Sequence, residues 1–472
     1  SGMVTERAQI GSALLESILG IKRFTGNVWA QGSQDMILTP TGNSGNYFSQ
    51  QDRRASRTEW MEIFSPAPID ARGKHNLKIG SEITRTTNRG DFSARPVDIL
   101  DNGGDLIKRI QFVNGSPFNR RDLETTFFAE DHYVINPNLS MDLGLRFERQ
   151  GITETIKIAP RGGIAWAPFG PSNTVIRGGF GLFYDRVPLD VYSFASYPEQ
   201  LVTTFAPDGR ILSGPTLFAN ITDRALRSKN PFIRSGDTAG NFAPYSATWN
   251  VEVDQPINRM LRVKASYLQS NSSGVVIFTP EKVDGRDALV LGGGGQSTYR
   301  QLELVARLHM SETREMFFSY VHARSQGDVN QFNNYLGNFP FPVIRSDVYS
   351  NLPGDLPNRF LAWGVLSLPW KMQISPLVEY RNGFPYAKVD AAQNFVGLPF
   401  TTRFPNFYSF DARISKDIKV NDKYALRLSV SGYNITNHFN PSAVFSNIAA
   451  PQLGVFFGDY KRHLTADFDV IF

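Results

Sequence analysis

The strongest constraint on the fold is the alternation of side-chain chemistry in the segment 139–148, LSMDLGLRFE. Apolar side chains occupy one parity, at Leu139, Met141, Leu143, Leu145 and Phe147. Polar, charged or small residues occupy the other, at Ser140, Asp142, Gly144, Arg146 and Glu148. Because successive side chains of a strand point to opposite faces, this segment predicts a strand with one apolar and one charged face. The apolar face meets a core in a soluble sheet and lipid in a membrane barrel, so one strand fits both.

The same alternation recurs along the whole chain, in HNLKIGSEIT (75–84), WNVEVD (249–254), LRVKASY (261–267), LELVARL (302–308), FDARIS (410–415) and LRLSVS (426–431). Apolar residues at helical spacing are rare by comparison. The dominant period of two predicts a protein built almost entirely of β-strands.

The connections between these strands alternate between short and long. The short ones lie at 135–138, 169–173, 256–259, 310–314, 369–371 and 420–423, and they are rich in residues that form turns. The long ones lie at 87–120, 186–243, 273–296, 326–356, 383–405 and 435–461. Within the long connection 273–296, LGGGG (291–295) is expected to form a flexible loop tip. Two rims this different are typical of bacterial outer-membrane barrels, which have short periplasmic turns and long extracellular loops.

The strand count also fits a large barrel. About twelve strands fit between Leu139 and the end of the chain, and four more fit near 14–30, 55–67, 74–86 and 121–135, which gives about sixteen. Many are ten residues or longer, and a tilted membrane-crossing strand needs about 9–11. The sequence therefore predicts an all-β fold, a large antiparallel transmembrane β-barrel of about sixteen strands.

Composition excludes several other classes. No run approaches the roughly 18 apolar residues that a membrane-spanning helix requires. The 472 residues include 49 Lys and Arg against 44 Asp and Glu, and this small, scattered excess gives no sign of nucleic-acid binding. The absence of cysteine excludes disulfides and thiolate metal sites and fits a bacterial envelope protein. The first twenty residues lack the basic and apolar regions of a signal peptide.

Three segments resemble the barrel of TonB-dependent receptors, specifically the Oar-like group. They are FFAEDHYVINPNLSMDLGLRFE (127–148), IAPRGGIAWAPFGPSNTVIRGGFGLFYDRV (158–187) and SFDARISKDIKVNDKYALRLSVSGYNITNHFNP (409–441). The last contains the family's asparagine-rich loop as Asn434, Asn437 and Asn440. The resemblance covers residues 120–470 well and the first part more loosely.

The resemblance implies a bacterial outer-membrane transport protein that recognises a solute and passes it across the membrane, or exports protein as Oar-like members do. Family receptors have a barrel of twenty-two strands and a plug domain that yields when TonB pulls on it. Neither the plug nor all the strands are found, so residues 1–472 are expected to be the C-terminal, barrel part of a longer protein. Its expected partners are outer-membrane lipid, the plug domain, TonB, the barrel-assembly machinery and an unidentified ligand.

The C-terminal segment TADFDVIF (465–472) resembles the closing strand of an outer-membrane protein. Phe468, Val470 and Phe472 share one parity, and the resemblance implies that they form the signal read by the barrel-assembly machinery.

No catalytic, cofactor-binding or metal site is predicted, and the protein is not expected to be an enzyme. GGGGQST (292–298) lacks the lysine of a phosphate-binding loop, and GGFGLF (178–183) lacks the third glycine of a dinucleotide fingerprint. The histidines at 75, 132, 309, 322, 438 and 463 are dispersed, and Asp101 and Asp105 are read as a solvated turn rather than a calcium site. Asp142, Glu252 and Asp254 are interpreted as polar residues of the lumen wall.

The aromatic residues form two groups. Those near predicted strand ends, where rings lie at the lipid–water boundary, are Phe147, Trp166, Phe183, Tyr184 and Trp249. Those in predicted loops are Phe194, Tyr197, Phe205, Phe218, Phe232, Phe242 and Tyr245. The loop group either contacts a ligand or forms small cores between loops, and packing is the favoured interpretation.

Two alternative functions remain. A chain that closes on itself would form a passive, porin-like channel. A soluble β-propeller or adhesin would show repeats of about 40–45 residues, and the sequence has none.

Overall fold

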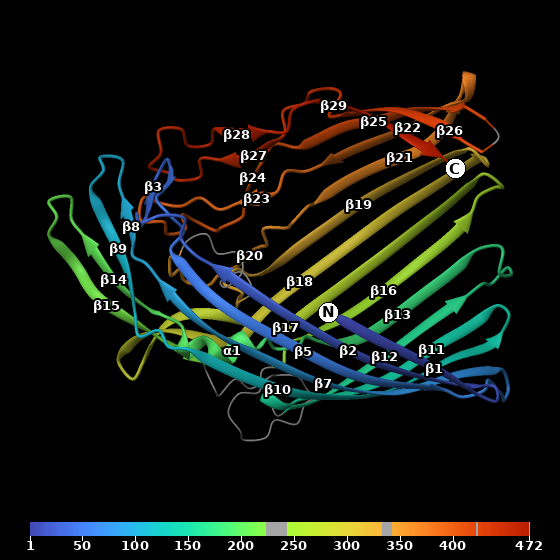
Figure 1. Ribbon diagram of the computed structural model, residues 1–472, viewed down its shortest axis with the longest axis horizontal. Coiled ribbons are helices and arrows are strands. Elements are labelled where there is room, and N and C mark those ends of the chain that lie inside the picture. Colours follow the sequence, from blue (N-terminus) through green and yellow to red (C-terminus); the bar gives the residue numbers. More distant parts are fainter. Residues whose placement is uncertain (154, 223–242, 333–341, 422, 472) are drawn as a thin grey trace.

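The computed structural model describes residues 1–153, 155–222, 243–332, 342–421 and 423–471. Within them, seventeen long strands follow one another as a single meander, each antiparallel to the next. They are β1 (Gly2–Ile10), β2 (Ala13–Val28), β5 (Ser49–Ser65), β7 (Lys74–Ala94), β10 (Phe118–Asn136), β11 (Leu139–Gln150), β12 (Thr155–Trp166), β13 (Val175–Tyr184), β16 (Tyr245–Pro256), β17 (Leu261–Val283), β18 (Arg286–Ser311), β19 (Arg314–Asp328), β21 (Asn358–Leu368), β22 (Met372–Arg381), β25 (Phe407–Lys419), β26 (Ala425–Tyr433) and β29 (His463–Ile471). This meander curls around a wide hollow (Figure 1).

The predicted all-β barrel fold is confirmed, and each of the sixteen expected positions holds a strand. The additional strand is β1, which forms a hairpin with β2 from the pair Gly2–Ile21 to the pair Ile10–Ala13. Its alternation is weak because Met3 and Val4 are adjacent apolar residues, so no clear period of two marks this segment. Among the described residues, no helix is long and apolar enough to cross a membrane.

The two rims differ as expected. At one rim the strands are joined by short turns, on the right in Figure 1. At the other rim the connections carry their own small elements. These are β3 (Met36–Thr39), β4 (Gly42–Ser44), β8 (Val97–Leu100), β9 (Leu106–Val113), α1 (Leu189–Ser193), β14 (Glu199–Phe205), β15 (Ile211–Thr222), β20 (Tyr349–Asn351), β23 (Pro385–Tyr386), β24 (Thr402–Arg403), β27 (Pro441–Val444) and β28 (Phe456–Asp459). Among the described residues, two connections at this rim carry no strand or α-helix of their own. They are the connection between β11 and β12, which contains the short 3-10 helix Gly151–Thr153, and the turn between β17 and β18.

The expected long loop at 273–296 is wrong. Strands β17 and β18 continue through it as a tall hairpin that turns at Asp284 and Gly285, both with positive φ. LGGGG is therefore part of β18 and not a loop tip. A Cβ at Gly295 would lie 2.6 Å from a methyl carbon of Ile277 on β17, so glycine is needed for close cross-strand approach rather than for flexibility.

The two faces of the wall differ in chemistry. One face carries a belt of exposed apolar side chains on successive strands, named here the apolar belt. It comprises Trp60, Ile79, Ile83, Phe127, Leu143, Leu145, Phe147, Ile164, Phe180, Trp249, Val251, Leu302, Leu304, Ile414, Leu428, Val430, Phe468 and Val470. The opposite parity carries charged side chains and contacts the loops that fold into the hollow, as Arg53 of β5 does through its ion pair with Asp190. The apolar belt therefore faces outward, where a membrane barrel meets lipid.

The predicted boundary aromatics are only partly correct. Trp166 ends β12 and is exposed beside the short turns, as expected for a ring at the lipid–water boundary. Phe183 instead lies over the guanidinium of Arg161, 5.0 Å from its central carbon to the ring centroid, on the lumen side of the wall. The position of Phe183 near a strand end predicted its depth in the membrane, but it did not predict which face of the wall the ring occupies.

Candidate functional site

The long connections converge on a cavity of about 560 Å³, which lies within the size range of small-molecule sites. Residues from four separate connections and from strand β17 line it: Lys108, Ile110, Val202, Thr204, Phe218, Pro280, Val343, Ile344, Arg345, Ser346, Val348, Asn394, Phe395, Gly397 and Pro399. None of the four connections forms the cavity alone, so it exists only when the loops are packed together.

Two cationic side chains, Lys108 and Arg345, are the charged groups of the cavity lining. The Lys108 ammonium donates to the carbonyl oxygen of Ala392 at 2.9 Å and lies 3.5 Å from the amide oxygen of Asn394. The Arg345 Nε donates to the carbonyl oxygen of Gln393 at 2.7 Å, and its guanidinium lies 4.6 Å from the Phe395 ring centroid. Both cations are thus held by one short segment of the chain.

This segment is itself fixed by Asp390. Its carboxylate accepts a hydrogen bond from the backbone N–H of Asn394 at 2.9 Å and another from the Asn394 side chain at 3.1 Å. Asp390 forms no ion pair with Lys108 or Arg345, and its oxygens instead close the turn that carries the partners of both cations. The two cations of the cavity are therefore held by a turn that Asp390 itself stabilises.

Burial weakens the charged state of both groups. Loss of water lowers the pKa of Lys108, and the nearby Asp390 offsets this only in part. Loss of water likewise lowers the pKa of Arg345 to about 10. A bound anion would replace the missing water and stabilise both charges, so the cavity is suited to a negatively charged solute.

An apolar core supports one wall of the cavity. It consists of Met36, Leu38, Val97, Ile99, Ile110 and Val343, all buried, from β3, β8, β9 and the connection after β19. Ile110 and Val343 belong to both the core and the cavity lining. The loop packing that stabilises this rim therefore also sets the cavity's shape.

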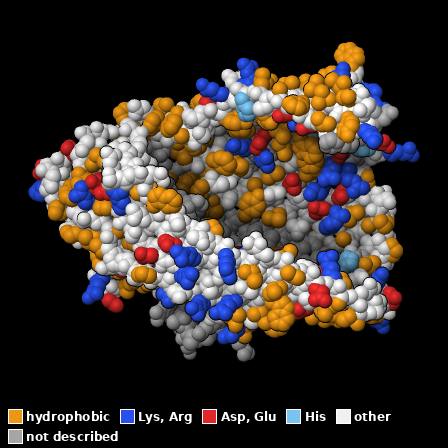
Figure 2. All heavy atoms as spheres, in the orientation of Figure 1, with side chains coloured by type: hydrophobic (Ala, Val, Ile, Leu, Met, Phe, Trp, Pro, Cys, Tyr) orange, Lys and Arg blue, Asp and Glu red, His pale blue; other side chains and the backbone are white. Residues whose placement is uncertain are grey.

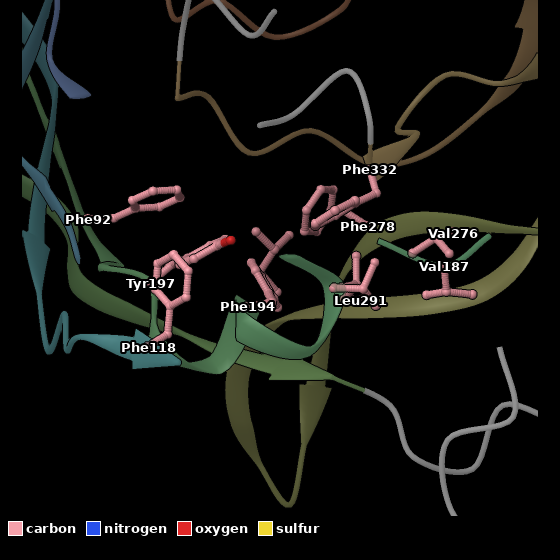
Figure 3. Close-up of a cluster of buried hydrophobic side chains, with 11 residues drawn as sticks. Phe92, Phe118, Val187, Phe194, Tyr197, Val276, Phe278, Leu291 and Phe332 are labelled. Atoms are coloured by element: carbon pink, nitrogen blue, oxygen red, sulfur yellow. The ribbon is translucent and has the colours of Figure 1, made fainter. Parts of the chain in front are cut away.

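A second core joins the loops to the wall, as Figure 3 shows. It contains Phe92, Phe118, Val187, Val191, Phe194, Tyr197, Val276, Phe278, Leu289, Leu291 and Phe332. Phe194 and Tyr197 are two of the predicted loop aromatics, and their burial here confirms the packing interpretation for them. Phe218 instead lines the cavity, Phe205 lies on β14 and Tyr245 begins β16. Phe232 and Phe242 lie outside the described residues.

Asp190 of α1 ties this core to the inner wall. It forms an ion pair with Arg53 of β5 at 2.5 Å, accepts a hydrogen bond from the side chain of Asn88 on β7, and lies 3.3 Å from the Tyr197 hydroxyl. The segment after β13 is thereby held inside the mouth of the hollow.

The lumen wall carries ladders of opposite charges. Glu252 pairs with Arg177 at 2.8 Å and with Lys264 at 3.4 Å, and Asp254 pairs with Arg262 at 3.0 Å. These contacts confirm the interpretation of Glu252 and Asp254 as wall residues. Asp142 similarly lies 2.7 Å from the His132 ring. The pairs of Glu252 and Asp254 place opposite charges side by side on the lumen wall.

The weak sequence motifs have structural explanations. GGGGQST and GGFGLF lie within β18 and β13. One oxygen of Asp101 accepts backbone hydrogen bonds from Gly103 at 2.8 Å and Asp105 at 2.9 Å, which closes a turn. No group of three or more possible metal ligands occurs among the described residues.

Known proteins with the same architecture are outer-membrane proteins. The sequence profile of the outer membrane beta barrel domain family matches residues 152–282. The outer membrane transporter YddB from Escherichia coli superimposes with a TM-score of 0.65 at 12% identity, over 99% of this chain and 62% of YddB. The siderophore receptor PiuA from Acinetobacter baumannii gives 0.56 at 10% identity, over 99% and 63%. The pyoverdine receptor FpvA from Pseudomonas aeruginosa gives 0.60 at 8% identity, over 99% and 60%. No curated protein matches the sequence.

These comparisons confirm the expected fold and outer-membrane location, and they confirm the resemblance to the barrel of TonB-dependent receptors. The chain spans less than two thirds of the length of each of these three structures. Lys108 and Arg345 were not predicted from the sequence as site residues. They lie in connections more than 200 residues apart, and no local pattern marks either of them.

Proposed function

We propose that this chain forms the wall and the solute-capturing loops of an outer-membrane transport protein of the TonB-dependent receptor type. The observation that carries the proposal is the cavity at the long-loop rim, with Lys108 and Arg345 held against it and a polar lumen behind it. Its solute is negatively charged, because neither cation has an ion-pair partner among the described residues. The similar structures are those of transporters and receptors, which supports a role in transport.

The free edges of the sheet support the expectation that the chain is the C-terminal part of a larger barrel. Within the described residues no pairing joins β1 to β29, and Figure 1 shows these two strands at separate margins of the opening. In lipid, unpaired backbone groups cost several kcal/mol each, so further strands must cover both edges.

The direction of the edge strands limits how the barrel closes. The number of strands is odd, so β1 and β29 both run from the long-loop rim to the short-turn rim. Antiparallel closure therefore needs an odd number of further strands. Five of them would complete the twenty-two of the receptor family, whose lumen contains a plug. We place these strands, the plug and the TonB-contacting segment before residue 1.

The last strand also fits a role in assembly. Phe468 and Val470 are exposed on the outward face of β29, whereas Phe472 lies outside the described residues. We propose that the three form the signal for the barrel-assembly machinery. We propose that transport is directed inward, as in solute receptors. Export of protein, as in Oar-like members, is the alternative.

Conductance tests the gated transporter against the passive porin. The full-length protein, reconstituted in planar bilayers, is expected to be electrically silent, and removal of the segment upstream of the barrel is expected to give stable currents. Large steady currents from the full-length protein would contradict gating and support the porin.

A binding experiment tests the cavity. Ferric tricatecholate serves as the anionic probe, with Lys108→Gln and Arg345→Gln as variants and Arg210→Gln, on the exposed β14–β15 turn, as the matched control. Each cavity variant is expected to weaken binding by about tenfold and the control to leave it unchanged. Equal binding by all four proteins would refute the assignment of this cavity.

A further inference from the structure

Five arginines gather on the outer surface of the wall, on four neighbouring strands. They are Arg23 of β2, Arg54 of β5, Arg85 and Arg89 of β7, and Arg121 of β10, named here the arginine patch. They line one shallow hollow of about 410 Å³. In the sheet register Arg89 lies opposite Arg54, and Arg121 lies opposite Thr87, between Arg85 and Arg89.

Strand parity shows that the arginine patch faces outward. Arg85 and Arg89 share the parity of Ile79 and Ile83 in the apolar belt. The opposite parity of the same strand includes Asn88, which bonds to Asp190 inside the hollow. The patch is therefore on the lipid side of the wall. Figure 2 shows Lys and Arg side chains on the front wall, where these strands lie.

The patch lies toward the extracellular rim. Strand β7 runs from the short turns to the long loops, and it passes Ile79 and Ile83 before it reaches Arg85 and Arg89. On β10, which runs the other way, Arg121 precedes Phe127 of the apolar belt. The arginines thus begin where the apolar belt ends, at the level of the outer-leaflet headgroups.

The charges of the patch are largely uncompensated. Arg54 lies 3.6 Å from Asp52, and both side chains are more than half exposed. The other four arginines form no ion pair with any residue that the structure describes. Arginines of the lumen wall, such as Arg177 and Arg262, are paired. Unpaired guanidinium groups beside lipid are costly, so a ligand of opposite charge is expected.

We propose that the arginine patch binds the phosphate groups of the phosphorylated glycolipid of the outer leaflet, lipopolysaccharide. Guanidinium groups bind phosphate oxygens in pairs of parallel hydrogen bonds. The hydroxyls of Ser56 and Thr87 lie in the same hollow and are hydrogen-bonded to each other at 2.7 Å, which leaves one hydroxyl proton of the pair to donate to a ligand. Continuity with the apolar belt favours a lipid over a soluble anion. One molecule places its phosphates on the arginines and its acyl chains on Ile83 and Leu123, which a soluble anion does not do.

The test compares binding of bisphosphorylated lipid A and of its dephosphorylated form to the full-length protein in detergent, by native mass spectrometry. The patch variant is Arg85→Gln/Arg89→Gln/Arg121→Gln. The matched control removes three exposed arginines elsewhere, Arg210→Gln/Arg286→Gln/Arg314→Gln. We expect the patch variant to lose lipid A affinity by about tenfold or more, and the control to retain it.

Two further arms separate the sources of phosphate and guard against a misfolded variant. Unmodified protein is expected to bind phosphorylated lipid A more tightly than the dephosphorylated form, a comparison that does not depend on the folding of any variant. Inorganic phosphate at equal concentration is expected not to displace the bound lipid A. Equal binding of the two lipid forms, or unchanged binding by the patch variant, would overturn the proposal. Displacement by inorganic phosphate would overturn it in favour of a soluble anion.

Discussion

Removal of the negative charge of Asp190 is expected to release the segment 186–197, which carries α1, from the inner wall of the barrel. Asp190→Asn keeps the size of the side chain but ends the ion pair with Arg53, and it leaves one acceptor oxygen for the two donors, Arg53 and Asn88. Hydrogen bonds to charged, half-buried groups contribute about 1.5–3 kcal/mol. Because Asp190 and Arg53 keep some contact with water, we expect a loss of about 2 kcal/mol, which raises the open population of this segment roughly 30-fold.

Hydrogen–deuterium exchange measures this opening directly. Amides of residues 186–197 are expected to exchange roughly 30-fold faster in Asp190→Asn, whereas amides of β16 to β19 keep their protection. Asp208→Asn, in an exposed pair with Arg210 at 3.9 Å, serves as the control and is expected to change nothing. Unchanged exchange of 186–197 in Asp190→Asn would show that the apolar core alone holds the segment, and the reasoning from the ion pair would be refuted.

Three further predictions concern the wall, the loop core and the cavity. Leu145→Arg on the apolar belt is expected to destabilise the barrel by about 2–4 kcal/mol in a urea titration, whereas Ser415→Arg on the lumen side is expected to be tolerated. Leu291→Ala is expected to cost about 2–5 kcal/mol of stability in the same titration, because the side chain is fully buried, and Leu212→Ala, which is exposed, much less. Burial lowers the pKa of Lys108, so binding of ferric tricatecholate is expected to weaken as the pH rises through a range that begins below the ordinary lysine pKa of 10.5. Folding stability changes in the opposite sense there, rising with pH, because the unfolded chain binds the proton more tightly. A pH titration that is identical in Lys108→Gln would contradict this prediction.

The fold followed from the sequence where two signals agreed. In LSMDLGLRFE the alternation predicted the strand and its apolar side, and the asparagine and proline of 135–138 predicted the turn before it. Where one signal was weak, the prediction failed. The glycines of 291–295 indicated a flexible loop, yet they lie in β18, where Gly295 approaches Ile277 of β17 too closely for a side chain.

The site was less predictable because it depends on contacts between distant loops. Lys108 and Arg345 have unremarkable neighbours in sequence, and only the packed loops bring both against the turn made by Asp390. The arginine patch shows the same limit. Arg54, Arg89 and Arg121 each look like an ordinary polar position, and only the register of three strands shows that they share one outward surface.

The tall hairpin of β17 and β18 connects the wall directly to the loops, because the same two strands belong to both. Its second strand has 26 residues, about 86 Å at a rise of about 3.3 Å per residue, which is far more than the membrane requires. Its upper part supplies Val276, Phe278, Leu289 and Leu291 to the loop core and Pro280 to the cavity. Movement of these strands at bilayer depth is therefore transmitted along a continuous backbone to the cavity above it, through the irregular register between Ser273 and Ile277, where the hairpin bends.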